Sequence, residues 1–80
     1  MKTVIAYTYR NRFGLWSIRR EPSGRWQAMF EDDGLGSYST AEMAHDDLIS
    51  GGSYWPGSGI DPSECGLPME FVEWKRMYHR

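Results

Sequence analysis

The chain has 80 residues, of which 40% are hydrophobic and 25% charged, with a formal net charge of −2 and one cysteine. These values predict a single soluble domain over residues 1–80, since the composition is ordinary for a folded protein. One cysteine excludes an internal disulfide, and no apolar run reaches the length of a signal-peptide core or a membrane span. We therefore expect a cytoplasmic protein with no membrane contact.

The first thirty residues predict a three-stranded antiparallel meander. Apolar side chains recur at every second position in 5–9, 15–18 and 26–30, which is the period of a strand. The stretch EPSG at 21–24 suits a tight turn, because proline presets the second position and glycine fits the fourth. The side chains expected on the core face are Ile5, Tyr7, Tyr9, Trp16, Ile18, Trp26, Ala28 and Phe30.

A helix is expected next, over residues 40–49. Ser39 as N-cap with Glu42 three residues later matches a capping box, and the pair Gly51 and Gly52 marks the end. At about 100° per residue, this helix has an apolar arc and an opposite arc that should face solvent. The apolar arc holds Ala41, Ala44, His45, Leu48 and Ile49, and the opposite arc holds Glu42, Met43, Asp46 and Asp47.

Residues 51–68 contain five glycines and three prolines, which predicts a connector whose Tyr54 and Trp55 cover an edge of the core, with a binding loop as the alternative. Within it, DPSE at 61–64 predicts one helical turn. Pro68 is expected to open a second helix over 69–78, with acidic residues early and basic residues late. The predicted fold is therefore α+β: a three-stranded antiparallel meander followed by two helices packed on one face.

The sequence contains no complete set of residues for a catalytic site or for a metal site. Glu42, His45 and Asp46 resemble half of a carboxylate-bridged metal site, whose second half is missing. Cys65 stands beside Glu64 without the nearby cations that would lower the pKa of a thiol. The serines occupy caps and loops, where turn chemistry explains them. We therefore expect a protein that is not an enzyme and uses no metal or cofactor.

Charge is distributed unevenly along the chain. Residues 1–30 carry six basic residues and one acidic residue, whereas residues 31–70 carry nine acidic residues and no Lys or Arg. One interpretation is that the two halves attract each other in the fold. The other interpretation gives the protein one basic and one acidic surface, each of which could dock a partner.

The acidic surface leads to the first functional hypothesis, a non-enzymatic binding protein. Carboxylates on a small rigid scaffold can occupy a basic, nucleic-acid-binding groove of a host protein or nucleoprotein complex, with charge raising the association rate. A methionine within that face would add apolar contact area. The expected partner-binding residues are Glu31, Asp32, Asp33, Glu42, Met43, Asp46 and Asp47.

The basic surface supports the alternative hypothesis, a small nucleic-acid-binding accessory protein. Arginines on a sheet rich in Tyr and Trp resemble an aromatic stacking platform, although the acidic half opposes phosphate binding. The residues that would make these contacts are Arg10, Arg12, Arg19, Arg20 and Arg25. For the oligomeric state, a monomer and a weak homodimer joined through Cys65 both stay open.

The stretch GLGSYSTAEMAHDDLISGG, followed by PGSGIDPSECGLPMEFVEW, resembles a group of small uncharacterised proteobacterial proteins. The shared pattern is G-x-Y-x-[ST]-x-x-x-A-x-D-D, a Gly-Gly stop, P-x-S-G-[IV]-D and G-[IL]-P-x-x-[FL]-x-E-W, and it covers about residues 24–74. The resemblance brings no assigned activity and implies no catalytic residues. In size and acidity the chain is also similar to anti-CRISPR proteins of phages and mobile elements, which implies an inhibitor of a host defence complex.

Overall fold

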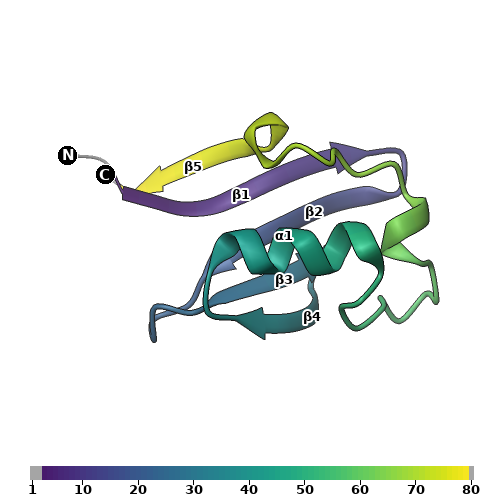
Figure 1. Ribbon diagram of the computed structural model, residues 1–80, viewed down its shortest axis with the longest axis horizontal. Coiled ribbons are helices and arrows are strands. Elements are labelled where there is room, and N and C mark those ends of the chain that lie inside the picture. Colours follow the sequence, from purple (N-terminus) through teal and green to yellow (C-terminus); the bar gives the residue numbers. More distant parts are fainter. Residues whose placement is uncertain (1–2, 80) are drawn as a thin grey trace.

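The computed structural model describes residues 3–79 and shows a five-stranded antiparallel sheet with one α-helix lying across one of its faces (Figure 1). The strands stand in the order β4-β3-β2-β1-β5. The elements in chain order are β1 (Thr3–Asn11), β2 (Gly14–Arg20), β3 (Trp26–Phe30), β4 (Asp33–Tyr38), α1 (Ala41–Ser50), the 3₁₀ turns η1 (Pro62–Glu64) and η2 (Phe71–Glu73), and β5 (Lys75–His79).

The predicted fold class, three strands followed by two helices, is therefore wrong. The first missing element is β4, which pairs with β3 across a two-residue turn at Glu31 and Asp32. Gly34 and Gly36 hid this strand in the sequence, because glycine is unfavourable inside strands. Here the register shifts between Ala28 and Met29, and Gly36 takes the positive φ of 143° on the opposite strand.

The predicted second helix is also wrong. Only the short turn η2 forms, and the chain then continues as β5, which pairs with β1. The helix prediction rested on acidic residues early, basic residues late and aromatic spacing, and such dipole terms contribute only about 0.3–1 kcal/mol each. Pairing with β1 satisfies backbone groups that would otherwise form an open sheet edge.

Helix α1 packs its apolar arc on the sheet, as its periodicity predicts. Ala41, Ala44 and Leu48 are buried, and they contact a core that includes Trp16 and Leu35. The N-cap is Thr40 rather than Ser39: its hydroxyl accepts the Met43 N–H at 3.2 Å. The helix ends at Gly51, which adopts the left-handed conformation with φ 78°.

The two faces of the sheet differ, and the difference follows from strand register. Trp16, Ile18, Ala28 and their cross-strand neighbours lie on the side of α1 and form the core, together with segment 65–74. The face turned away from α1 is called the open face here. Alternation along the strands gives it Ala6, Thr8 and Arg10 from β1, Leu15, Ser17 and Arg19 from β2, Gln27 and Met29 from β3, and Lys75 and Met77 from β5.

Most of the expected core face is correctly placed on the helix side. The exception is Ile5, which falls at the register shift between Val4 and Ala6 and is only half-buried. The shift lets β1 bend while it keeps its pairing with β5 on either side. All of the aromatic side chains expected in the core therefore lie on the side of α1, which bears directly on the two functional hypotheses.

Candidate binding surface

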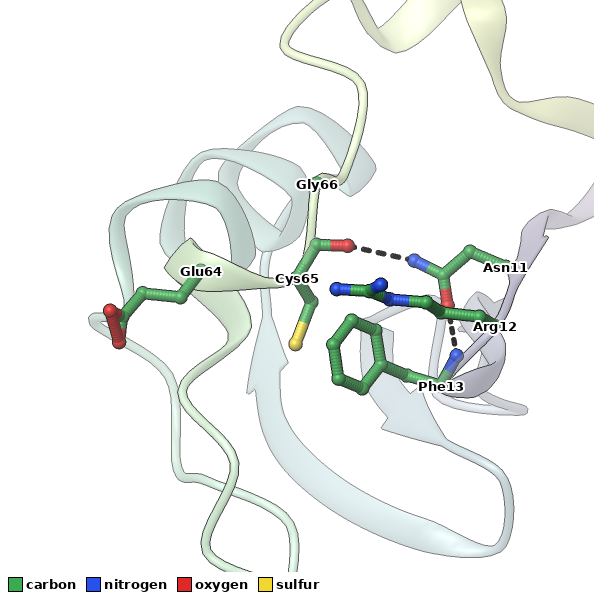
Figure 2. A pocket seen from close by; sticks show the side chains of 6 residues that line it. All are labelled: Asn11, Arg12, Phe13, Glu64, Cys65 and Gly66. Atoms are coloured by element: carbon green, nitrogen blue, oxygen red, sulfur yellow. Dashed lines mark hydrogen bonds between the residues drawn. The ribbon is translucent and has the colours of Figure 1, made fainter.

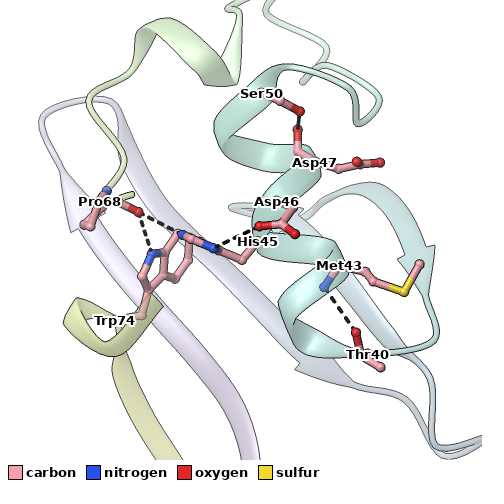
Figure 3. A network of polar contacts seen from close by, with 8 residues as sticks. All are labelled: Thr40, Met43, His45, Asp46, Asp47, Ser50, Pro68 and Trp74. Carbon is pink, nitrogen blue, oxygen red and sulfur yellow. Dashed lines mark hydrogen bonds and ion pairs between the residues drawn. The ribbon is translucent and has the colours of Figure 1, made fainter. Parts of the chain in front are cut away.

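The outer side of α1 presents charge and one apolar side chain to solvent. Glu42, Met43 and Asp46 are exposed, with Met43 at 50%, and Asp47 is half-buried on the flank that faces β4. Figure 3 shows Met43 and Asp47 on one side of the helix and His45 on the other. The predicted outer arc is therefore in the expected place, but Asp47 is less exposed than Glu42, Met43 and Asp46.

The loop that follows α1 is tied to the helix and to β4 by backbone hydrogen bonds. The Gly52 N–H donates to the Asp47 carbonyl at 2.9 Å, and the Tyr54 N–H donates to the Leu35 carbonyl at 2.9 Å. Further along, the Gly57 N–H donates to Asp33 Oδ2 at 3.2 Å. These contacts bring Asp33 and Asp47 to the two ends of one short loop.

The two aromatic residues of this loop do not cover the core, contrary to the sequence-based expectation. Tyr54 is 78% exposed and Trp55 is 51% exposed. The Trp55 indole N–H donates to the Gly51 carbonyl at 3.1 Å, which holds its ring against the end of the helix. The loop therefore presents two aromatic side chains beside the carboxylates of Asp33 and Asp47. We call Asp33, Glu42, Met43, Asp46, Asp47, Tyr54 and Trp55 the acidic-aromatic surface.

Tyr38 connects this surface to the sheet. Burial, followed by its contact with the Asp47 carboxylate, raises the pKa of Tyr38 to about 12, with a smaller contribution from Tyr54. The phenol therefore stays neutral at physiological pH and can donate toward Asp47. The result is a compact group of two phenols and one carboxylate on the β4 side of the helix.

The other two predicted acidic residues lie apart from this group. Glu31 has a left-handed backbone with φ 51°, and its carboxylate accepts the Leu15 N–H, which turns it toward the strand β2. Asp32 is exposed in the same turn. Of the three consecutive acids that leave β3, only Asp33 is placed next to the loop after α1.

The two halves form no close ion pair within residues 3–79. No Asp or Glu there lies within 4.0 Å of a Lys or Arg nitrogen, and the pair that meets this criterion joins His45 Nδ1 to Asp46 Oδ1 at 3.9 Å. The attraction expected between the halves is therefore not carried by close ion pairs. Charges of both signs share the side of α1, because Arg20 and Arg76 lie on that face of the sheet.

The predicted arginines do not form one surface. Arg10 and Arg19 lie on the open face, whereas Arg20 pairs with Trp26 on the side of α1. Arg12 stacks over the Phe13 ring at 4.9 Å from its centroid. Arg25 donates to the Ser37 hydroxyl at 2.9 Å, and that hydroxyl donates to Glu21. Because the core aromatics lie on the other face, the arginines of the open face have no stacking platform beside them.

A cleft of about 440 Å³ lies between the β1–β2 turn and η1, lined by Asn11, Arg12, Phe13, Glu64, Cys65 and Gly66 (Figure 2). The Asn11 amide closes its inner wall by donating to the Cys65 carbonyl at 2.8 Å. Cys65 is only 6% exposed, and burial, with smaller contributions from Asp61 and Glu64, raises the pKa of its thiol. Arg12, which lines the same cleft, acts in the opposite direction on this pKa, so the expectation that no cation lies near Cys65 is wrong. A buried, protonated thiol is a poor partner for an intermolecular disulfide.

The residues that resembled half of a metal site are arranged differently. His45 is 4% exposed and its Nε2 lies 2.8 Å from the Pro68 carbonyl (Figure 3). Glu42 is exposed. In the part of the chain that the structure describes, no group of three or more His, Cys, Asp or Glu side chains is placed to hold a metal ion. His45 acts as a packing residue between α1 and the segment before β5.

Comparison with known proteins gives no match: no family model, no curated protein and no solved structure matches this chain. The resemblance to the proteobacterial group therefore stays a prediction. In the described region, the single α-helix is too short to span a membrane.

Proposed function

We propose that this protein is a non-enzymatic binding protein of the cytoplasm that uses its acidic-aromatic surface to occupy a basic, nucleic-acid-binding surface of a host complex. An inhibitor of the anti-CRISPR type fits this role. The observation that supports the proposal best is that exposed aromatic side chains share one surface with carboxylates that have no Lys or Arg nitrogen within 4.0 Å among residues 3–79. Asp33 and Asp47 flank the loop that presents Tyr54 and Trp55.

Each component of this surface has a distinct physical contribution. Carboxylates without an Arg or Lys partner keep their full charge for a cationic partner, so they accelerate encounter and penalise acidic surfaces. Exposed Trp, Tyr and Met side chains supply the apolar area that carries most interface free energy. Backbone hydrogen bonds hold the loop in place before binding, which reduces the entropy lost when the complex forms.

The test is capture of a basic nucleic-acid-binding complex from nuclease-treated bacterial lysate, with quantification of that complex by mass spectrometry. The test variant is Glu42→Lys with Asp46→Lys, since both side chains are exposed on the outer side of α1. The matched control is Glu70→Lys with Glu73→Lys, which changes the net charge equally at exposed positions elsewhere. We expect the first variant to lose the complex and the control to retain it.

Competition separates inhibition from simple association. If the acidic-aromatic surface occupies the nucleic-acid site, added nucleic acid should displace the protein from the purified complex, and the protein should displace nucleic acid. A variant with Tyr54→Ser and Trp55→Ser should bind more weakly at every salt concentration, because it loses apolar contact rather than charge. Equal loss of binding in the Glu42→Lys, Asp46→Lys variant and in the Glu70→Lys, Glu73→Lys control would contradict the proposal.

A further inference from the structure

The open face of the sheet carries a second group of charges, opposite in sign to the acidic-aromatic surface. Arg10, Arg19 and Lys75 are exposed, and alternation places all three on the face turned away from α1. They come from three neighbouring strands, β1, β2 and β5. Lys75 joins the two arginines only because the C-terminal segment forms a strand, so sequence reasoning did not include it.

Register fixes how these cations are spaced. Lys75 lies opposite Thr8, Arg19 lies opposite Ala6, and Arg10 is two residues beyond Thr8 on β1. Neighbouring strands are about 4.8 Å apart and alternate residues about 7 Å apart, so the three backbone positions are spread over roughly 8–14 Å. Within the described residues, none of the three has a carboxylate oxygen within 4.0 Å.

Two small side chains lie between the cations. Ala6 is 3% exposed and Ser17 is 2% exposed, although α1 lies on the other face of the sheet. The Thr8 hydroxyl is half-buried on the same face, on the strand between Arg19 and Lys75. A hydroxyl group between cations is a kind of group that contacts phosphate oxygens.

From this arrangement we propose that the β2–β1–β5 part of the open face binds the phosphate backbone of double-stranded nucleic acid, without reading its sequence. Complementary charge argues for a polyanion. A duplex is favoured over a single strand because single-strand binding uses aromatic stacking, and the core aromatics point to the other face. An acidic protein partner is less suited, because stable protein interfaces centre on desolvated aromatic anchors, which this part of the face lacks.

The β3–β4 part of the same face is excluded from the binding area. There Arg25 bonds to the Ser37 side chain, which in turn donates to the Glu21 carboxylate, so cation and anion lie together. Glu31 borders the area at the β2 side, where its carboxylate is held by the Leu15 N–H. With the acidic helix on the opposite side of the molecule, a duplex should approach only through β2, β1 and β5.

Fluorescence anisotropy with purified protein and a labelled DNA duplex of mixed sequence tests this proposal. For three phosphate contacts, log K should fall with log[salt] with a slope of about −2.7. Arg10→Ala, Arg19→Ala and Lys75→Ala should each reduce the steepness of that slope by about 1. The controls are Arg20→Ala and Arg76→Ala, on the side of α1, which should leave the slope unchanged.

Four results would overturn the proposal. The first is no binding of the wild-type protein at low salt, and the second is tighter binding of a single strand of the same length. The third is an equal change of the salt slope in the control variants Arg20→Ala and Arg76→Ala. Self-association at low salt that the three substitutions abolish would assign the face to the acidic helix of a second copy instead. Since no host complex is present, this experiment can fail or succeed independently of the proposed inhibition.

Discussion

His45 Nε2 lies 2.8 Å from the Pro68 carbonyl and joins the only α-helix of the described chain to the segment that leads into β5. Because a carbonyl only accepts, the proton of this hydrogen bond is on Nε2. The imidazole also stacks on Phe71, with ring centroids 4.8 Å apart, and meets Trp74 edge-on at 5.8 Å. One buried histidine thus connects the helix to the element that sequence reasoning placed wrongly.

Replacing His45 should weaken this connection. His45→Ala removes a buried hydrogen bond and two aromatic contacts, so we expect the free energy of unfolding to fall by about 2–3 kcal/mol. Urea unfolding measures the change. The matched control is His79→Ala, since His79 is exposed on β5 and should change stability by less than about 0.5 kcal/mol. Similar values for both variants would show that His45 does not hold the segment to the helix.

Gly51 should be harder to replace than another glycine with the same backbone. Gly51 and Gly59 have φ of 78° and 83°, so alanine is strained at both, by about 1–2 kcal/mol. A Cβ at Gly51 would also lie 2.9 Å from Asp61 Oδ1, whereas a Cβ at Gly59 has no atom within 4 Å. Gly51→Ala should therefore lower the thermal midpoint more than Gly59→Ala. Equal midpoints would mean that Asp61 moves aside at no cost.

Tyr38 should make stability depend on alkaline pH. Its pKa is raised from 10.0 to about 12 by burial first and by Asp47 second, so the folded protein favours the neutral phenol. This contribution is complete below pH 10, declines as the unfolded phenol ionises, and is lost as pH rises through about 12. Between pH 10 and about 12, the free energy of unfolding should therefore fall less for Tyr38→Phe than for the wild-type protein. Tyr78→Phe, at an exposed position on β5, is the control and should follow the wild-type profile.

The Cys65 thiol should resist modification in the folded protein. Burial and the nearby Asp61 and Glu64 carboxylates raise its pKa, so little thiolate is present at neutral pH. We expect a slow reaction with a thiol-specific reagent under native conditions and a fast one in denaturant. The protein should also stay monomeric on non-reducing gels after air oxidation. A fast native reaction, or a disulfide-linked dimer, would restore Cys65 as a dimer contact.

Periodicity predicted the parts of the fold that depend on local sequence. The alternation around Trp16, Ile18 and Ala28 placed β2 and β3, and the arc of Ala44 and Leu48 placed the buried side of α1. The two strands that were missed are defined by pairing rather than by local pattern. β4 contains two glycines, and β5 has charge and aromatic spacing that also suit a helix, so only the free edges of β3 and β1 explain them.

The residues of the candidate surfaces also differ in whether local sequence could locate them. The outer acids of α1 could be located from helical spacing, because the helix itself was predictable. Tyr54 and Trp55 could not, since their exposure depends on hydrogen bonds from the loop to Leu35 and Asp33, far away in sequence. Lys75 could not be grouped with Arg10 for a related reason: their common face follows from the β1–β5 register.

The hydrogen bond from the Tyr54 N–H to the Leu35 carbonyl has a consequence for solubility. β4 is one border of the sheet, and an uncovered border can recruit strands from other molecules and start aggregation. The loop that displays the two aromatic side chains also shields this border. Shortening it would therefore remove a binding element and a safeguard against self-assembly at once, so tolerated changes should be concentrated in its side chains rather than in its length.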